Sequence, residues 1–265
     1  MSEDVHHAES PTRPPEPKPV SGLVLVDKPA SGKIKSMTVV RAVKRKMIAG
    51  GQPKSIKVGH AGTLDPLASG MLIVLVGKAT RLCDQLMADE KEYLATLDLS
   101  KWSPTDDLER SAEPNPELPP ERIPTPEQVE RVLAEKFTGI IQQRPPDFSA
   151  IWVDGKRAYH LARKGRETNI QPRPIIIHSV RIVEYRWPML TIDVCCGKGT
   201  YIRSMARDIG LALTESPAVL TALRRTRIGA FHIDHATPLE SLPEKMTPAD
   251  LTPPPIAAQP SIPSE

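Results

Sequence analysis

Hydrophobic and polar positions along the chain follow two periods, which separate the predicted strands from the predicted helices. Short apolar or alternating runs bounded by turn residues predict strands, and these runs cover residues 22–29, 71–79, 92–100, 174–187 and 189–198. Apolar residues three or four positions apart predict helices, at residues 36–48, 79–88, 125–137 and 199–213. This order predicts an α+β fold with a mixed, largely antiparallel central sheet and flanking helices.

The segments between these elements are less regular. Residues 59–70 predict a glycine-punctuated loop, and residues 101–125 are a polar, proline-rich stretch that predicts a long surface segment. Residues 146–167 predict a strand, a turn and a short basic helix. Residues 218–233 predict irregular chain that leads into a strand.

Two of the predicted helices begin with a hydroxyl residue. Ser36 precedes one apolar-periodic run, and Thr125 precedes another with Pro126 directly after it. A serine or threonine at this position accepts a hydrogen bond from a free backbone N–H, and proline suits the first helical position. Ser36 and Thr125 are therefore the predicted caps.

The two ends of the chain are rich in proline and polar residues and follow neither period. Residues 1–19 and 238–265 are predicted to be disordered, because they offer too little apolar surface to offset the entropy of ordering. A folded body of residues 20–237 remains. The whole chain carries a net charge of +3, and both ends hold more acidic than basic residues. The more basic body fits a polyanionic partner, and ordinary solubilising charge is the alternative.

The number of cysteines, the metal-ligand spacings and the length of the apolar runs limit the classes of protein to which this chain can belong. The three cysteines, Cys83, Cys195 and Cys196, do not form a disulfide framework, which favours a reduced, cytoplasmic setting. Metal-ligand spacings such as CxxC and HExxH do not occur. No apolar run approaches about 18 residues, so we expect neither export nor membrane insertion.

Asp65 is the first candidate for chemistry. It lies in GHAGTLDPLASG, where Gly62 and Gly70 let the backbone take unusual angles. Pro66 disfavours a helical conformation at the residue before it. The loop therefore presents a carboxylate between apolar elements. The alternative is a structural aspartate that caps the turn.

Three further clusters combine basic and aromatic residues. In CCGKGTYIRSMARD, Lys198 stands at a helix start that would attract a phosphate, and Arg203 and Arg207 share one helix face. Tyr93 begins an otherwise aliphatic strand, and GKRAYHLARKGRE interleaves basic residues with Tyr159. Such mixtures suit RNA backbone and exposed bases. Solvated helix faces and a structural tyrosine are the alternatives.

Together these segments resemble the TruB family of tRNA pseudouridine synthases. GLVLVDKP resembles the family's opening motif, and GHAGTLDPLASGMLIVLVGKAT resembles its catalytic segment. KEYLATLDL and CCGKGTYIRSMARDIG are similar to the segments with its active-site tyrosine and essential arginine. RPPDFSAIWVDGKRAYHLARKG resembles its RNA-gripping insertion, the thumb, here about residues 142–174, and TALRRTRIGAF resembles its last motif. The resemblance covers about residues 20–240 and implies a pseudouridine synthase fold.

The resemblance also implies a role for each matched residue. Asp65 would be the catalytic aspartate, with Arg203 paired to it and Tyr93 stacked on the target base. Whether the carboxylate attacks the sugar or removes its proton stays open. Further implied substrate-binding residues are His60, Lys28, Tyr201, Lys198 and Leu223.

The activity implied is isomerisation of a uridine in the TΨC arm of tRNA, at position 55, without cofactor or metal. We expect a monomer that binds tRNA, with no membrane and no obligatory protein partner. The same chemistry on another RNA is one rival hypothesis, and a non-catalytic tRNA folding chaperone is another. No RNA-binding PUA domain is recognisable in the Pro-rich C-terminal stretch.

Two departures from the family pattern are visible. The turn at residues 31–35 looks lengthened relative to the family's tight turn. In the thumb, Phe148 and Trp152 stand where the family usually has tyrosine and lysine. A hydroxyl and a positive charge are lost there, so we expect some RNA contacts to differ.

Overall fold

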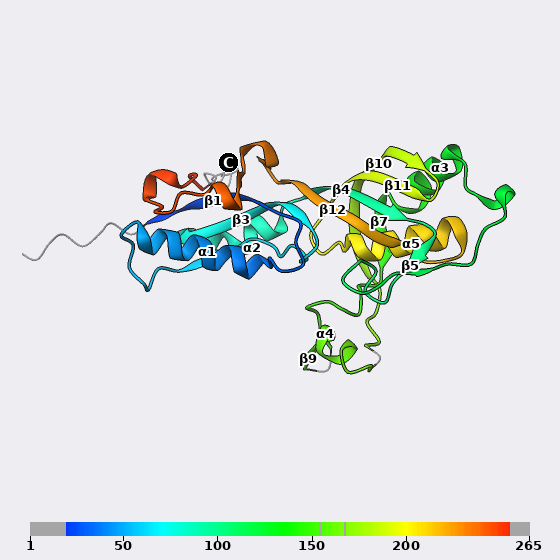
Figure 1. The fold of residues 1–265 in the computed structure, drawn as a ribbon, viewed down its shortest axis with the longest axis horizontal. Helices are drawn as coiled ribbons and strands as arrows, with labels where there is room; N and C mark the ends of the chain where they lie inside the picture. Colours follow the sequence, from blue (N-terminus) through cyan, green and yellow to red (C-terminus); the bar gives the residue numbers. More distant parts are fainter. Residues whose placement is uncertain (1–19, 154, 167, 255–265) are drawn as a thin grey trace, which may run out of the picture.

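A long mixed sheet runs through the protein (Figure 1). The computed structural model describes residues 20–254 apart from residues 154 and 167, and the predicted N-terminal tail lies outside the described residues. Within the described chain the sheet has ten strands. Its main order is β14 (Thr237–Pro238), β1 (Ser21–Lys28), β3 (Ser69–Gly77), β12 (Val219–Ile228), β4 (Lys91–Asp98), β11 (Met189–Cys196), β10 (Arg173–Arg186) and β7 (Gly139–Gln143).

Short strands complete the β-structure. β2 (Val58–His60) pairs with β3, and β13 (Phe231–His232) pairs with β12. Two separate hairpins are formed by β5 (Lys101–Trp102) with β6 (Glu113–Pro114), and by β8 (Trp152–Val153) with β9 (Lys156–Arg157). Most pairs are antiparallel, and β1–β14 and β3–β12 are parallel. The predicted α+β class with a mixed, largely antiparallel sheet is confirmed.

At the end of the sheet formed by β1 and β3, helices pack on both faces. At the other end, two helices pack against a single core. Alternate residues of β1 and β3 face two different cores. α1 (Ser36–Ala49) packs into one of them, and α2 (Cys83–Ala88) into the other. α3 (Pro126–Lys136) and α5 (Ile202–Thr214) cover the core of β4, β10 and β11. Burial on both faces explains why β1 and β3 read as continuous apolar runs.

The chain between β7 and β10 leaves the body and projects to one side (Figure 1). It contains β8, β9 and α4 (Ala158–Ala162), and it corresponds to the segment identified above as the thumb. At its base, Arg144 forms an ion pair with Asp147 at 2.7 Å, and Thr168 also bonds to that carboxylate. These polar contacts tie the two ends of the thumb segment to each other.

The structure corrects two sequence expectations about regular elements. Residues 219–228 form one strand, β12, at the centre of the sheet, rather than irregular chain. Register shifts after Leu220 and Arg225 interrupt its pairing with β4, so the alternation that would predict a strand is broken. The cap at Thr125 is confirmed with a full capping box, whereas the residue before α1 is Lys35 and makes no side-chain cap. Ser36 has another partner, described below.

The C-terminal boundary of the folded body is also corrected. Residues 238–254 were expected to be disordered, but Leu242 and Met246 are buried in the core beneath α1. Thr252 exchanges two backbone hydrogen bonds with Leu23 of β1. The apolar residues of segment 238–254 are too widely spaced to show a helical or strand period. The proline-rich composition therefore wrongly predicted disorder for this segment. Residues 255–265 lie outside the described part of the chain.

Candidate active site

The loop at residues 61–68, between β2 and β3, holds Asp65 over the centre of the sheet. Gly62 and Gly70 have φ of +94° and +101°, a region that favours glycine. A Cβ on Gly70 would stand 2.3 Å from the carbonyl oxygen of Arg225. These two glycines therefore let the loop turn and let its end lie directly against β12.

Buried polar side chains form hydrogen bonds with the backbone of this loop. The Ser36 hydroxyl donates to the Leu64 carbonyl at 3.1 Å and accepts from the Leu64 N–H at 2.9 Å. The Lys28 ammonium donates to the carbonyls of Pro66 and Ala68. Backbone groups on both sides of Asp65 are thus held by side chains from α1 and β1, which explains why Ser36 does not cap its helix.

Arg203 pairs with Asp65 as predicted. Its Nε lies 2.8 Å from Oδ2 of Asp65, and a second guanidinium nitrogen lies 3.5 Å from Oδ1. The side chain is only 6% exposed and also donates to the carbonyls of Thr105 and Phe148. Burial opposes the charged form, but Asp65 and Asp107 outweigh it and raise the pKa of Arg203. The guanidinium is therefore a permanent, fixed charge beside Asp65.

Tyr93 of β4 forms another wall of the site. It lies opposite Arg225 in the β4–β12 ladder and opposite Val194 in the β4–β11 ladder. Burial raises the pKa of its hydroxyl above the ordinary value, and Arg225 counteracts part of this effect. At neutral pH Tyr93 is therefore a neutral phenol, with an aromatic face for stacking and a hydroxyl for hydrogen bonding.

One pocket brings together six of the eight predicted residues. Its lining includes Asp65, Tyr93, Lys198, Tyr201, Arg203 and Leu223. They come from the catalytic loop, from β4, from the β11–α5 turn and helix start, and from β12. Cys196 also lines this pocket, and burial raises the pKa of its thiol to about 12. The thiol thus stays protonated at neutral pH and is a poor nucleophile there.

The other two predicted residues lie outside the lining of this pocket. Lys28 is fully buried, with its ammonium on loop carbonyls, so it supports the loop rather than contacting substrate. His60 lies in β2, and burial and the charge of Arg225 lower the pKa of its imidazole. Its Nδ1 is buried and has no hydrogen-bond partner among the described residues.

Three residues of the site were missed by sequence reasoning. Arg225 is buried and donates to the carbonyls of Met71, Thr63 and Gly62, so it clamps both ends of the loop. Lys91 lines the pocket and donates to carbonyls at the end of α2. Both lie within motifs quoted above, and their partners are backbone atoms that no residue pattern identifies.

The third missed residue corrects the prediction of a surface segment for one turn, residues 103–107, whereas residues 108–123 are largely exposed as expected. Asp107 is buried with its Oδ2 3.7 Å from Nε of Arg203. Ser103 and Thr105 are buried beside it, and their hydroxyls donate to the Asp107 carbonyl. This turn supports Arg203 from beneath and is no surface segment. The polar side chains of this turn form hydrogen bonds within the turn, so they can be buried. A polar sequence therefore wrongly predicted an exposed segment here.

The two thumb substitutions have different surroundings. Phe148 lines the pocket, with the guanidinium of Arg110 5.0 Å from its ring centre, and its carbonyl serves Arg203. Trp152 is 62% exposed, with the guanidinium of Arg157 4.4 Å from its ring centre. Trp152 lines a basic hollow of the thumb with Lys156, Arg157, His160, Lys164 and Arg166.

Metal-binding clusters and membrane-spanning helices are both absent from the part of the chain that the structure describes. No group of three or more His, Cys, Asp or Glu side chains there is arranged to hold a metal ion. No helix in the same part of the chain has the length and apolar character to cross a membrane.

Solved structures share this fold. A chain in the crystal structure of a Cbf5-Nop10-Gar1 complex matches with a TM-score of 0.60 and 31% identity over 83% of this chain. A chain in an H/ACA RNP bound to a substrate RNA containing 2'-deoxyuridine matches with a TM-score of 0.58 and 28% identity. This chain spans about half the length of each, 53% and 52%. The mixed sheet and the pocket at its centre define a pseudouridine synthase.

The family follows from sequence comparison. Residues 45–202 match the N-terminal domain of the TruB family of pseudouridylate synthases. The chain belongs to this family and is therefore an isomerase. The tRNA pseudouridine synthase B of Phocaeicola vulgatus is 49% identical over 191 residues, covering 72% of this chain and 79% of the relative. That of Flavobacterium johnsoniae is 39% identical, covering 84% and 95%.

Proposed function

We propose that this protein isomerises a uridine of tRNA to pseudouridine, and that its target is position 55 in the TΨC arm. The names of the relatives support tRNA as substrate. The arm and position are what the resemblance of the motifs implies. The observation that carries the chemistry is the Asp65–Arg203 pair, which faces a pocket walled by Tyr93 and Leu223.

The reaction explains why such a pocket is needed. A uracil stacked inside an RNA loop cannot reach a carboxylate in a recess, so the nucleotide must flip out of the stack. Tyr93 and Leu223 offer aromatic and apolar surface that compensates for the lost stacking. Lys198 and Tyr201 lie at the start of α5, where a backbone phosphate of the flipped nucleotide would be favoured.

The chemical balance of the reaction requires no added group. The bond between the sugar and N1 of uracil breaks, the base turns, and a bond from the same sugar carbon to C5 replaces it. The proton on C5 leaves, and N1 gains one. Asp65 supplies the carboxylate for the cleavage step, and the fixed charge of Arg203 holds that carboxylate in place. Because only one proton is exchanged and no other atom is gained or lost, residues of this chain suffice.

One assay tests the proposal. An unmodified T-arm hairpin with tritium on C5 of the target uridine is incubated with the protein, and released tritium is counted. We expect release with wild type and with the control Asp84→Asn, an exposed carboxylate on α2, but none with Asp65→Asn. Absence of release with wild type, or equal release with Asp65→Asn, contradicts the proposal.

A further inference from the structure

An unusually long stretch of the chain carries positive charge only. Between Asp27 and Asp65 there is no acidic residue, and the stretch contains Lys28, Lys33, Lys35, Arg41, Lys44, Arg45, Lys46, Lys54 and Lys57. Lys28 and Lys46 donate to backbone carbonyls. Among the described residues none of the other seven takes part in an ion pair. Surface charge that serves solubility alone normally mixes both signs, so this stretch calls for a separate explanation.

Four of the six exposed basic residues of the stretch lie on α1 or directly before it, and the other two, Lys54 and Lys57, follow the helix. The buried face of α1 packs Val39, Val43 and Met47 into the core. Arg41 and Arg45 are exposed and four residues apart, so they project from one face of the helix. Lys33 and Lys35 are exposed at the start of α1, in the lengthened turn. We call these four residues the basic ridge.

The basic ridge begins at the catalytic loop and leads away from it. Ser36 bonds to Leu64, and a Cβ on Gly32 would lie 3.6 Å from the Leu67 side chain. The turn that carries Lys33 and Lys35 therefore abuts the loop of Asp65. From there α1 extends over 14 residues, or about 21 Å at about 1.5 Å per residue.

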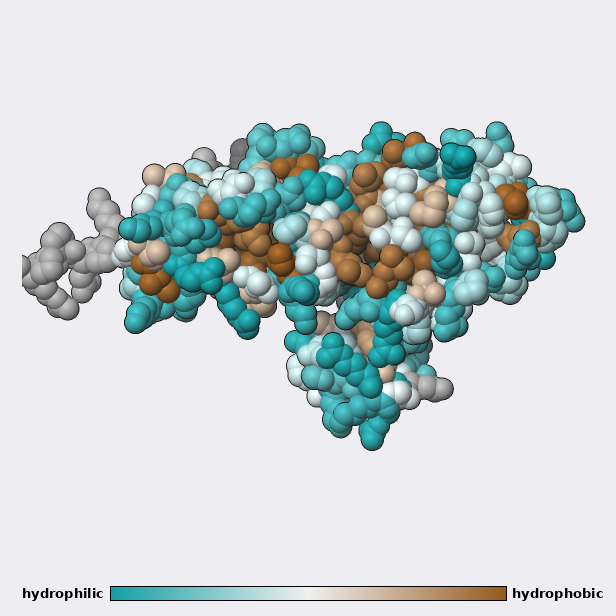
Figure 2. Space-filling model, viewed as in Figure 1, coloured by the Kyte–Doolittle hydropathy of each residue, from teal (hydrophilic) through white to brown (hydrophobic). Residues whose placement is uncertain are grey.

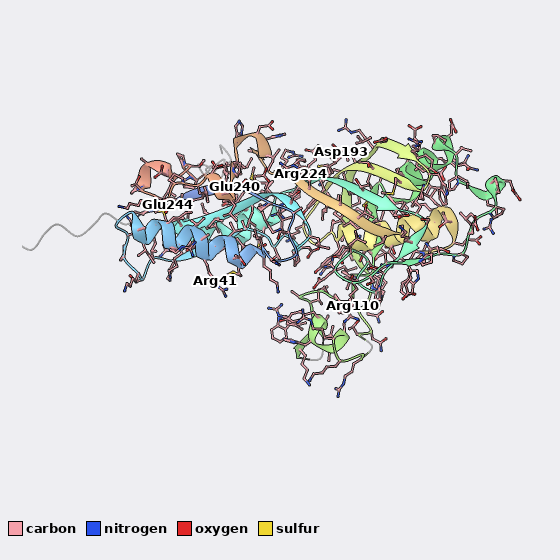
Figure 3. All side chains as sticks on the ribbon, in the orientation of Figure 1. Arg41, Arg110, Asp193, Arg224, Glu240 and Glu244 are labelled. Carbon is pink, nitrogen blue, oxygen red and sulfur yellow. The ribbon has the colours of Figure 1, made fainter. Side chains whose placement is uncertain are left out.

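The ridge and the thumb face a common space. Figure 3 shows Arg41 at the edge of α1 on the side from which the thumb projects, and Arg110 near the base of the thumb. Figure 2 shows hydrophilic side chains along this lower edge of α1, with a notch between them and the thumb. An RNA held at the thumb with one nucleotide in the pocket would direct its adjoining duplex either along α1 or away from it. The ridge favours the first direction.

We propose that the basic ridge binds the phosphate backbone of the RNA stem that adjoins the target loop. The proposal rests on the proposed function, because it takes the pocket as the place where the uridine enters. From Ser36 to Arg45 the ridge covers about 15 Å at about 1.5 Å per residue, which matches about four base pairs at roughly 3.4 Å each. Exposed, unpaired lysines and arginines without interspersed carboxylates suit a phosphate backbone, whose contact needs charge but no base readout.

Partners of other classes fit the ridge less well. An amphipathic helix that lies on a membrane inserts a broad apolar face, but the apolar face of α1 is buried in the core. Met37 is the one large hydrophobic residue of α1 that is markedly exposed in the described structure. An acidic protein partner would need no alignment with the catalytic loop, whereas an RNA stem requires it.

Binding to two RNAs separates the ridge from the pocket. One is a T-arm hairpin whose stem is trimmed to a few base pairs, and the other has a stem that extends past the end of α1. The variants are Lys33→Ala with Lys35→Ala, Arg41→Ala with Arg45→Ala, and all four together. The matched control is Arg131→Ala with Lys136→Ala, two exposed cations on α3. Dissociation constants are measured by fluorescence anisotropy over a salt series, and thermal unfolding verifies each fold.

We expect the fourfold variant to bind the long-stem RNA roughly tenfold or more weakly, with each double variant between it and wild type. The slope of log K against log salt should shrink by about one per lost phosphate contact. Affinity for the trimmed hairpin and the single-turnover rate at saturating RNA should stay close to wild type. The control variant should match wild type on both RNAs.

Three results would overturn the proposal. They are unchanged affinity of the fourfold variant for the long-stem RNA, equal weakening on both RNAs, or equal weakening by the control. Unchanged RNA affinity together with lost binding to anionic phospholipid vesicles would assign the ridge to a membrane instead. Tritium release by wild type is scored separately, so a failure of the ridge is distinguishable from a failure of the proposed isomerase activity.

Discussion

Asp65 depends on side chains from several distant parts of the chain. Arg203 holds its carboxylate, while Lys28, Ser36 and Arg225 hold the backbone on both sides of it. Asp65, Tyr93 and Arg203 were predictable because they are motif residues whose side chains carry chemistry. The supporting residues were missed or misplaced because their partners are carbonyl oxygens, which any residue provides.

Lys28 gives a pH-dependent prediction. Burial lowers the pKa of its ammonium from 10.5 to about 8, with the charge of Asp65 acting in the opposite direction. The charged form donates to three carbonyls, those of Pro29, Pro66 and Ala68. The neutral amine has only two N–H donors for these three carbonyls, so its lone pair would face the third carbonyl oxygen. We therefore expect kcat of the wild type to fall as pH rises through about 8.

Lys28→Met tests this account, because methionine keeps the apolar stem but removes the ammonium. We expect kcat at pH 7 to fall by roughly tenfold or more, since a misplaced catalytic group is costly. The variant should also lose the decline above pH 8. Lys136→Met, at an exposed position on α3, should retain both rate and profile. If kcat of Lys28→Met falls above pH 8 as it does in wild type, a group other than Lys28 causes the fall.

At the scale of elements, the catalytic loop was predictable as a loop, but its docking was not. The glycine spacing indicates unusual backbone angles, whereas the contact of Gly70 with the backbone of Arg225 depends on β3 lying parallel to β12. That pairing joins residues far apart in sequence, across a strand whose register shifts hid it from periodicity.

Gly70→Ala should lower both stability and activity. The new Cβ would meet backbone atoms of Arg225 at 2.3–3.0 Å, at a φ of +101° that disfavours side chains. We expect a loss of about 2–4 kcal/mol in the free energy of unfolding, measured by urea denaturation. Gly59→Ala is the matched control, because a Cβ there meets nothing within 4 Å. Equal effects of the two substitutions would show that the contact with β12 is unimportant.

On the scale of the whole molecule, the fold class was predictable and the boundary of the body was not. Most strands were predictable, because a strand buried on one face has alternating apolar residues and a strand buried on both faces has a continuous apolar run. Leu242 and Met246 are isolated apolar residues among prolines, and they become core only because β1, β3 and α1 leave a space for them.

Met246→Ala tests the corrected boundary. Met246 is 1% exposed, and truncation of a buried methionine leaves a cavity in the core beneath α1. We expect it to cost about 2–4 kcal/mol of stability and to lower Tm. The exposed neighbour Glu244, shown in Figure 3, is the control, and Glu244→Ala should leave Tm nearly unchanged. A Tm for Met246→Ala equal to that of wild type would return residues 238–254 to the status of a tail.

The central claim is that the pocket around Asp65 converts one uridine of tRNA to pseudouridine. The most direct measurement treats an unmodified, full-length tRNA transcript with the protein, labels pseudouridine with carbodiimide and maps the label by primer extension. We expect one new stop, which reports position 55, with wild type and none with Asp65→Asn. A stop at another position, stops that persist in Asp65→Asn, or no stop with wild type would contradict the claim.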